Sequence, residues 1–332
     1  MNFDILNQKI INSKKNIKNF IVDTKLKKSE ELSSKFNNIV LLKHEYMQLT
    51  GSFKIRGALN TLINLRKKTK IFGVLGLSSG NHGLGLAKAC KLNNLPCVIC
   101  MSSNVPENKI QLIKSENAEV RILGQSQDEV ELKLKSILEK EKLNYIPPFD
   151  HIDIICGQGT IGLEISENLK EIDKIIIPIS GGGLISGISI IVKQNFPKCK
   201  IIGVSMEKGA AMFESQKSGF PKKVKEERTI ADALSGGIGI NNQYTFNIVR
   251  RNVDEIITVT EKEIIEAIKF MFNSEKKVIE GAGAVGIASV LSKKVDITGT
   301  TVILLSGSNI DLSTHNKIIK GNYTQPPSAT KF

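Results

Sequence analysis

The stretch LLKHEYMQLTGSFKIRGA, residues 41–58, decides the fold and marks the centre of the chemistry. Within it, Lys54 follows TGS, precedes an Arg-Gly-Ala turn of helix, and lies between the apolar Phe53 and Ile55. An apolar setting lowers the pKa of a lysine and makes its amine more nucleophilic. Lys54 is therefore the candidate reactive group, whereas most other lysines have the context of solvated surface residues.

Outward from this stretch, short β-branched runs alternate with helix-like segments. This alternation predicts an α/β fold with mostly parallel sheets. The strand-like runs are 38–43, 72–78, 97–101, 119–123, 174–180, 200–205, 255–260 and 301–306. The helix-like segments include 81–92, 106–116, 127–141, 160–170 and 261–273.

Three glycine-containing loops follow predicted strands: SSGNHG at 78–83, SGGGL at 180–184 and SGSN at 306–309. Because ligands bind at the carboxyl ends of strands in open α/β sheets, we expect these loops to converge on one site. SGGGL opens a helix-like segment, and its backbone N–H groups suit a phosphate dianion. Glycine-rich turns also serve close packing alone, so the sequence leaves both interpretations open.

The composition argues against several classes of protein. The 332 residues, 41% of them hydrophobic, suffice for two lobes with sizeable cores. No apolar run approaches the roughly 18 residues of a membrane span, and the N-terminus predicts an amphipathic helix rather than a signal peptide. We therefore expect a soluble, cytoplasmic protein without a membrane partner. The net charge of +13 comes from scattered lysines without interleaved aromatic residues, which argues against nucleic acid.

Cys97 and Cys100 form a CxxC within LPCVICM. No second CxxC or Cys/His pair lies nearby, so a buried strand is favoured over a metal or redox site. The five cysteines are an odd number in a large chain, which argues against a disulfide framework.

The order of the motifs is more specific than any one of them. TGSFKIRGA (50–58), SSGNHG, PPFD (147–150) with GQGT (157–160), SGGGLISG (180–187), ADALSGGIG (231–239), EGAGAVG (280–286) and SGSNID (306–311) follow one another along the chain. In this order they resemble the fold-type II enzymes that use pyridoxal 5′-phosphate (PLP), in the threonine dehydratase and serine racemase group. The resemblance covers roughly residues 17–315.

This resemblance implies a tryptophan synthase β-like fold of two lobes, each with a mostly parallel, twisted sheet flanked by helices. We expect a large PLP-binding lobe of residues 1–66 and 148–320, a small mobile lobe of residues 70–147, and a loose polar tail at 321–332. The family also implies a homodimer.

The resemblance also implies roles around the cofactor. Lys54 would carry PLP as a Schiff base, Asn81 would hydrogen-bond its 3′-oxygen, and Ser306 would face the pyridine nitrogen. A neutral hydroxyl at that nitrogen leaves the ring a weaker electron sink than a carboxylate would, which suits β-elimination. The other implied cofactor contacts are Phe53, Gly181, Gly182, Gly183, Leu184 and Glu280.

The implied reaction turns a β-hydroxy amino acid of the threonine or serine type into a 2-keto acid and ammonia. The Lys54 amine, once freed by the substrate, would remove the α-proton as general base. Hydroxyl and backbone donors would hold the substrate carboxylate. The implied substrate-binding residues are Ser78, Ser79, Gly80, Asn81, His82, Gly236 and Gly237.

The chain departs from the family pattern in two places. In the cation-dependent, racemase-like members, two acidic residues six positions apart bind a divalent cation after the strand that corresponds to KIIGV. Here those positions are Ser205 and Ala211, so we predict no metal site. ADALSGGIG replaces a common ADG. Together with SMEKGAAM (205–212), SQDEVE (126–131) and NNQYTF (241–246), it looks most like the dehydratases encoded with ectoine and hydroxyectoine breakdown. Those enzymes usually differ from this chain at Ser52, Ser79 and Ser308.

Several alternatives therefore stay open. The substrate could be 3-hydroxyaspartate or a hydroxyectoine-derived compound instead of threonine or serine. Ser79 stands where racemases place the serine that protonates the face opposite the lysine, so racemisation is a further alternative. A PLP-fold binding protein without catalysis is a third, against which the retained Lys54, Asn81 and Ser306 argue.

Overall fold

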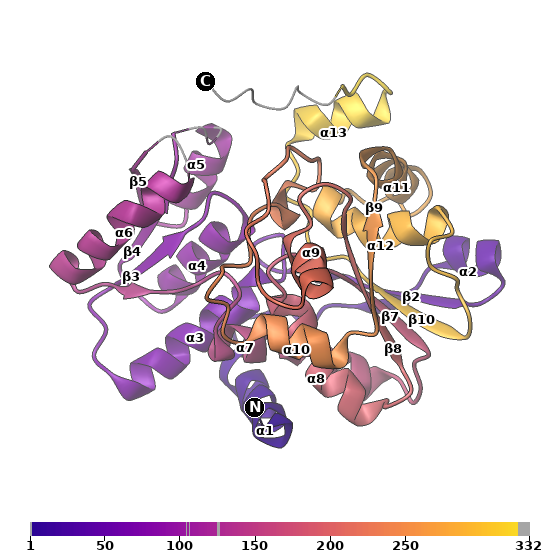
Figure 1. Cartoon of the computed structure of the whole chain (residues 1–332), viewed down its shortest axis with the longest axis horizontal. Helices are drawn as coiled ribbons and strands as arrows, with labels where there is room; N and C mark the ends of the chain where they lie inside the picture. The colour runs from indigo at the N-terminus through magenta and orange to yellow at the C-terminus, as the bar shows by residue number, and fades with distance from the viewer. Residues whose placement is uncertain (1, 104, 106, 125–126, 325–332) are drawn as a thin grey trace.

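The computed structural model describes residues 2–324 except 104, 106, 125 and 126. Two separate sheets organise these residues, one of six strands in the order β1-β2-β10-β7-β8-β9 and one of four in the order β5-β4-β3-β6. Figure 1 shows the smaller sheet and its helices on one side of the molecule and the larger sheet on the other. The sequence prediction of an α/β fold with mostly parallel sheets is confirmed.

The large sheet is parallel except at one edge. Its parallel strands are β2 (Ile39–Lys43), β10 (Thr300–Leu304), β7 (Lys174–Pro178), β8 (Lys200–Met206) and β9 (Glu255–Val259), and the antiparallel edge strand is β1 (Leu26–Lys28). Successive side chains of β7 point to opposite faces of the sheet: Ile175 and Ile177 pack in the core on one face, and Ile176 packs in the core on the other. The near-continuous apolar runs in the sequence reflect this burial on both faces.

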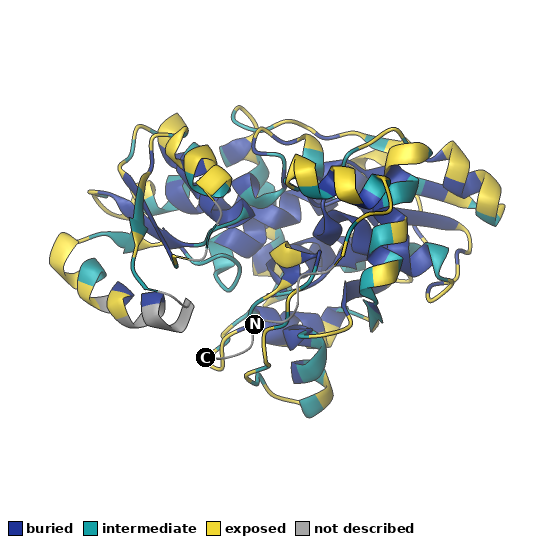
Figure 2. Cartoon of the chain, turned by 90° about the horizontal axis from the view of Figure 1, so that it is seen from above, coloured by how far each residue is buried: buried dark blue, intermediate teal, exposed yellow. Residues whose placement is uncertain are grey.

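Helices cover both faces of the large sheet. The core on one face includes side chains from α2 (Glu30–Phe36), α11 (Glu261–Asn273) and α12 (Gly281–Leu291). The core on the other face includes side chains from α7 (Ile152–Asn168), α8 (Gly183–Asn195), α9 (Ala211–Ser218) and α10 (Thr245–Asn252). Exposed residues lie along the outer sides of the helices, as Figure 2 shows. The other helical elements of this part of the chain are α1 (Phe3–Ile17), η1 (Glu45–Met47), η2 (Asp232–Leu234) and α13 (Leu312–Ile319).

The small sheet consists of β3 (Val74–Leu77), β4 (Cys97–Met101), β5 (Glu119–Ile122) and β6 (Asn144–Tyr145), all parallel. Helices α3 (Lys54–Lys68) and α4 (Asn81–Leu92) contribute to the core on one face, and α6 (Gln127–Glu141) to the core on the other. Helix α5 (Glu107–Lys114) packs against α4 and β5. All four strands lie within residues 70–147, while the exact lobe boundaries and the mobility of this lobe stay predictions.

The CxxC lies in a buried strand, as predicted. Every residue of β4 is buried, and both cysteines are free. Cys97 joins the core on one face of the small sheet and Cys100 the core on the other. Because the two thiols point to opposite faces, they cannot chelate one ion together.

Helix α7 starts at Ile152, eight residues earlier than the helix predicted at 160–170, so GQGT is helical. Its glycines permit close helix contacts. A Cβ on Gly157 would lie 2.6 Å from the Cα of Gly57, and one on Gly159 would lie 3.0 Å from the carbonyl oxygen of Gly187. Sequence reasoning placed the start too late because glycine disfavours helices when packing is ignored.

A buried ion network ties these elements together beside Lys54. Arg56 in α3 donates from Nε to Glu45 Oε2 at 2.8 Å and from Nη2 to Glu164 Oε2 at 2.9 Å. Lys43, at the end of β2, donates to Glu164 and to the carbonyl oxygen of Thr24. Both cations and both carboxylates are at most 2% exposed. Burial opposes ionisation of Glu164, but Arg56 and Lys43 hold its pKa below the ordinary value.

Among the described residues, none of the helices is both long and apolar enough to cross a membrane.

We expect Arg56→Leu to lower the free energy of unfolding by about 3–5 kcal/mol, because two buried carboxylates would lose their bidentate partner. Urea unfolding followed by circular dichroism measures this. Lys14→Ala is the control, since it removes an ion pair with the exposed Glu167 and is expected to cost less than about 1 kcal/mol. Equal effects of the two substitutions would contradict the structural role of the network.

Candidate active site

Lys54 is the first residue of α3 and is held by the loop that follows β10. The N–H of Phe53 donates to the carbonyl oxygen of Ser306 at 3.2 Å, and the N–H of Ser308 donates to the carbonyl oxygen of Gly51 at 2.9 Å. Gly51 has a φ of +68°, and a Cβ there would lie 2.4 Å from Asn309 Oδ1. Glycine therefore suits this turn both in conformation and in space.

The Lys54 amine donates to the carbonyl oxygen of Pro148 at 3.0 Å and lies 5.3 Å from the centre of the Phe53 ring. Burial lowers the pKa of Lys54 to about 8, although the negative charge of Glu280 opposes this shift. The amine is therefore neutral more often than a free lysine at the same pH. This is the property that a nucleophilic or proton-accepting lysine requires.

His82 shows that the site disfavours a second cation. Its Nε2 lies 3.0 Å from the carbonyl oxygen of Ile146. Burial, followed by the positive charge of Lys54, lowers the pKa of His82 to about 3. The imidazole is therefore neutral at physiological pH.

The loop Gly181–Gly183 precedes and opens α8 and has the features of an anion cradle. All three glycines are buried, and no acceptor among the described residues bonds their N–H groups or that of Leu184. Gly182 has a φ of +86°. Unpaired buried donors at the start of a 13-residue helix suit a phosphate group.

The same loop is also tightly packed, so the packing interpretation holds, while phosphate binding by the loop stays a prediction. A Cβ on Gly181 would lie 2.3 Å from Cδ1 of Phe149, and one on Gly183 would lie 3.0 Å from the Phe149 Cα. Phe149 directly follows Pro148, which accepts the hydrogen bond from Lys54. The glycine loop and the reactive lysine thus contact neighbouring residues of the same short segment. The Leu184 side chain belongs to the core of the large sheet.

Asn81 and Glu280 come together close enough to Lys54 for the charge of Glu280 to affect its pKa. Asn81 Nδ2 donates to Glu280 Oε1 at 2.7 Å, and the N–H of Asn309 donates to Glu280 Oε2 at 3.0 Å. Burial, together with the negative charge of Asp232, raises the pKa of Glu280 to about 7 against these two hydrogen bonds. This carboxyl group therefore titrates near neutral pH.

The remaining predicted residues divide into two groups. Ser78, Ser79 and Gly80 are half-buried at the end of β3, where Ser78 Oγ accepts the N–H of Gly80 at 3.2 Å. A Cβ on Gly80 would meet nothing within 4 Å, so there is open space beside this loop. Gly236 and Gly237 lie in the loop after η2, and no described contact joins them to Lys54. Their substrate-binding role stays a prediction.

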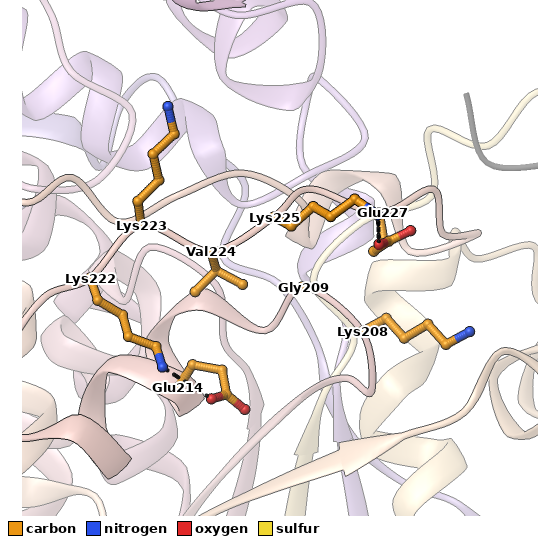
Figure 3. Close-up of a pocket in the computed structure, with 8 residues that line it drawn as sticks. All are labelled: Lys208, Gly209, Glu214, Lys222, Lys223, Val224, Lys225 and Glu227. Atoms are coloured by element: carbon orange, nitrogen blue, oxygen red, sulfur yellow. Dashed lines mark ion pairs between the residues drawn. The ribbon is translucent and has the colours of Figure 1, made fainter. Parts of the chain in front are cut away.

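Ser205 and Ala211, where the sequence predicts that the metal ligands are lost, flank in sequence a loop that lines a basic cavity. Ser205 is buried in β8, and Ala211 is the first residue of α9. A cavity of about 370 Å³ is lined by the loop between β8 and α9, by α9 and by the segment at 222–227. It is shown in Figure 3, and its lining residues are Lys208, Gly209, Glu214, Lys222, Lys223, Val224, Lys225 and Glu227. Lysines outnumber carboxylates here, which disfavours a divalent cation.

Sequence reasoning missed residues that act through their backbone or through distant partners. Pro148 contributes a carbonyl oxygen, and Phe149 contributes its packing on the glycine loop. Asn309 belongs to SGSNID, but the sequence indicates no separate role for it. Its partner Asn81 lies 228 residues away, so the only available signal was the presence of both residues in ordered motifs.

The fold and this lysine-centred site define a fold-type II PLP enzyme, and comparison with known proteins agrees. Residues 17–307 match the family described as pyridoxal-phosphate dependent enzyme. A putative threonine dehydratase from Sinorhizobium fredii is 43% identical over 95% of this chain and 95% of its own. The L-threonine ammonia-lyase of Thermotoga maritima is 39% identical over 92% of this chain and 76% of its own.

Solved structures give the same result. The processed form of threonine deaminase isoform 2 from Solanum lycopersicum has a TM-score of 0.89 and 33% identity, covering 96% of this chain and 89% of its own. Maize serine racemase has a TM-score of 0.88 and 31% identity, covering 95% of this chain and 96% of its own. The chain belongs to the pyridoxal-phosphate-dependent enzyme family, and its cofactor is PLP.

The raised pKa of Glu280 predicts a pH-dependent stability. A raised pKa means that the carboxyl stabilises the folded state below its ordinary pKa of 4.5, and that this contribution is lost as the pH rises to about 7. Relative to Glu280→Gln, the unmutated cofactor-free protein should therefore lose about 3 kcal/mol between pH 4.5 and 7. Urea unfolding at a series of pH values measures the difference. Glu266→Gln, at an exposed carboxylate, is the control, and a constant difference for Glu280→Gln would contradict the assignment.

Proposed function

We propose that this protein is a PLP-dependent ammonia-lyase that converts a β-hydroxy amino acid of the threonine or serine type into a 2-keto acid and ammonia. The observation that carries the proposal is Lys54. Its amine has a pKa lowered to about 8 and meets the segment that packs on the glycine loop. The names of the relatives from Sinorhizobium fredii and Thermotoga maritima support the substrate type.

In this proposal, each group of residues has a separate task. Lys54 binds the cofactor and then removes the α-proton of the substrate. The N–H groups of Gly181, Gly182 and Gly183 hold the phosphate, with Phe53 and Glu280 beside the cofactor. Asn81 donates to the 3′-oxygen, and Ser306 presents a neutral hydroxyl to the ring nitrogen. PLP, when bound, supplies the conjugated system that accepts electrons from the α-carbon.

The loop at the end of β3 binds the substrate carboxylate in this proposal. Ser78, Ser79 and Gly80 are half-buried there, and open space lies beside Gly80. Hydroxyl and backbone donors suit an anion. The small lobe would close over the substrate and exclude water. We further propose a cytoplasmic homodimer that requires no divalent cation and binds neither nucleic acid nor membranes.

Racemisation is the second candidate function. Maize serine racemase shares the fold, and Ser79 carries a hydroxyl in the loop at the end of β3. Elimination needs one base, whereas racemisation also needs a proton donor on the face of the substrate opposite Lys54. A panel of β-hydroxy amino acids, including 3-hydroxyaspartate and hydroxyectoine-derived compounds, assayed for keto acid and ammonia, would identify the substrate.

We expect Lys54→Ala to stay folded but to lose the visible absorbance of the lysine-linked cofactor. Turnover should fall by at least about 10³-fold, because the variant lacks the proton-accepting amine. Absorbance spectra, circular dichroism and ammonia release measure these changes. Lys70→Ala, at an exposed lysine, is the control. Normal turnover by Lys54→Ala would end the proposal.

Ser79→Ala separates the lyase from the racemase. If Ser79 binds the substrate carboxylate, the variant should raise KM about tenfold and leave kcat nearly unchanged. Chiral chromatography and keto-acid assays of both proteins measure the outcome, with the exposed Ser115→Ala as control. D-amino acid formed faster than keto acid by the unmutated enzyme, and lost in Ser79→Ala, would show a racemase instead.

A further inference from the structure

Asn309 contacts three segments of the site at once. Its Nδ2 donates to the carbonyl oxygen of Thr50 at 2.8 Å and to Asn81 Oδ1 at 2.7 Å. Its backbone N–H donates to Glu280 Oε2 at 3.0 Å. Thr50 lies in the turn before Lys54, whereas Asn81 begins the helix that follows the first strand of the small sheet. Asn309 therefore links the reactive lysine of one segment to the asparagine of another.

These bonds define which way the Asn81 amide faces. An amide can exchange its oxygen and nitrogen by a rotation, so only its partners select one orientation. Asn309 offers a donor to Asn81 Oδ1, and Glu280 offers an acceptor to Asn81 Nδ2. The two partners require the same orientation. Glu280 uses one hydrogen of Nδ2, and no other described residue accepts the second one.

We propose that Asn309 is a positioning residue that acts through Asn81. By donating to Asn81 Oδ1, it keeps the second Nδ2 hydrogen of Asn81 available to the 3′-oxygen of the bound cofactor. The hydrogen bond from Asn309 to Thr50 fixes the position of the turn before Lys54 relative to Asn81. This inference rests on the cofactor-binding roles of Lys54 and Asn81 proposed above.

The proposal has a spectroscopic consequence. A donor at the 3′-oxygen withdraws electron density that would otherwise stabilise the proton shared with the lysine nitrogen. Losing that donor should raise the pH at which the visible band of the lysine-linked cofactor titrates. Loss of one hydrogen bond to a charged group corresponds to a shift of about one pH unit.

The test uses Asn309→Asp in the full-length holoenzyme. The substitution keeps the size of the side chain but replaces its donor with an acceptor, so Asn81 is expected to turn its oxygen toward the cofactor. The visible band should titrate about one pH unit higher, and the Kd for PLP should rise about tenfold. Asn309→Ala adds no charge and should shift the band in the same direction. It replaces Asn309→Asp in the test if that variant does not fold.

Asn38→Asp is the matched control, because Asn38 also donates from Nδ2, to the carbonyl oxygens of Phe36 and Ile297, but makes no contact with the site. This control should leave the titration unchanged. The added charge of Asn309→Asp could shift the band directly, so the substitution is repeated in an Asn81→Ala background. A positioning effect disappears in that background, whereas a direct charge effect remains.

The outcomes are separable. A shift in Asn309→Asp and Asn309→Ala that vanishes with Asn81→Ala would support the inference. An unchanged titration, or a shift that persists with Asn81→Ala, would overturn it while leaving the lyase proposal intact. The absence of any visible band in the unmutated protein with PLP would overturn both.

Discussion

The buried pairing of Arg56 with Glu45 and Glu164 is the constraint on which the rest of the site depends. A charge removed from water is tolerated only when its partners are in place, so these side chains have to assemble together. Lys43 supplies the second cation, which balances the two carboxylates. The network joins the end of β2, the start of α3 and the middle of α7. Lys54, two residues before Arg56, takes its position from that assembly.

A second buried glutamate follows the opposite logic. Glu164 faces two cations, and its pKa lies below the ordinary value. Glu280 receives its hydrogen bonds from the amide of Asn81 and the backbone of Asn309, and its pKa rises to about 7. Neutral donors satisfy the oxygens without fully offsetting the cost of burying the charge. The first carboxylate is therefore fixed in charge and structural, whereas the second titrates near neutral pH.

Sequence reasoning succeeded where the information is local. The runs at 174–180 and 301–306 predicted β7 and β10 because burial on both faces leaves a continuous apolar pattern. The apolar neighbours and the motif of Lys54 predict its reactive role. The predicted start of α7 lies too late in the chain, because its glycines are explained only by contacts with other helices. The carbonyl oxygen of Pro148 and the partners of Asn309 depend on contacts between segments far apart in the chain, which no local pattern encodes.

The glycine loop at 181–183 also makes the stability of the folded protein depend on the cofactor. Its buried N–H groups have no acceptor among the residues that the structure describes, and a buried donor left without a partner costs a fold about 1–3 kcal/mol. A phosphate group relieves that cost only in the folded state. The equilibrium between folded and unfolded chains therefore shifts toward the folded state as the concentration of PLP rises. A shortage of PLP would thus have two effects. Less of the enzyme would hold its cofactor, and more of the protein would be unfolded and open to proteases.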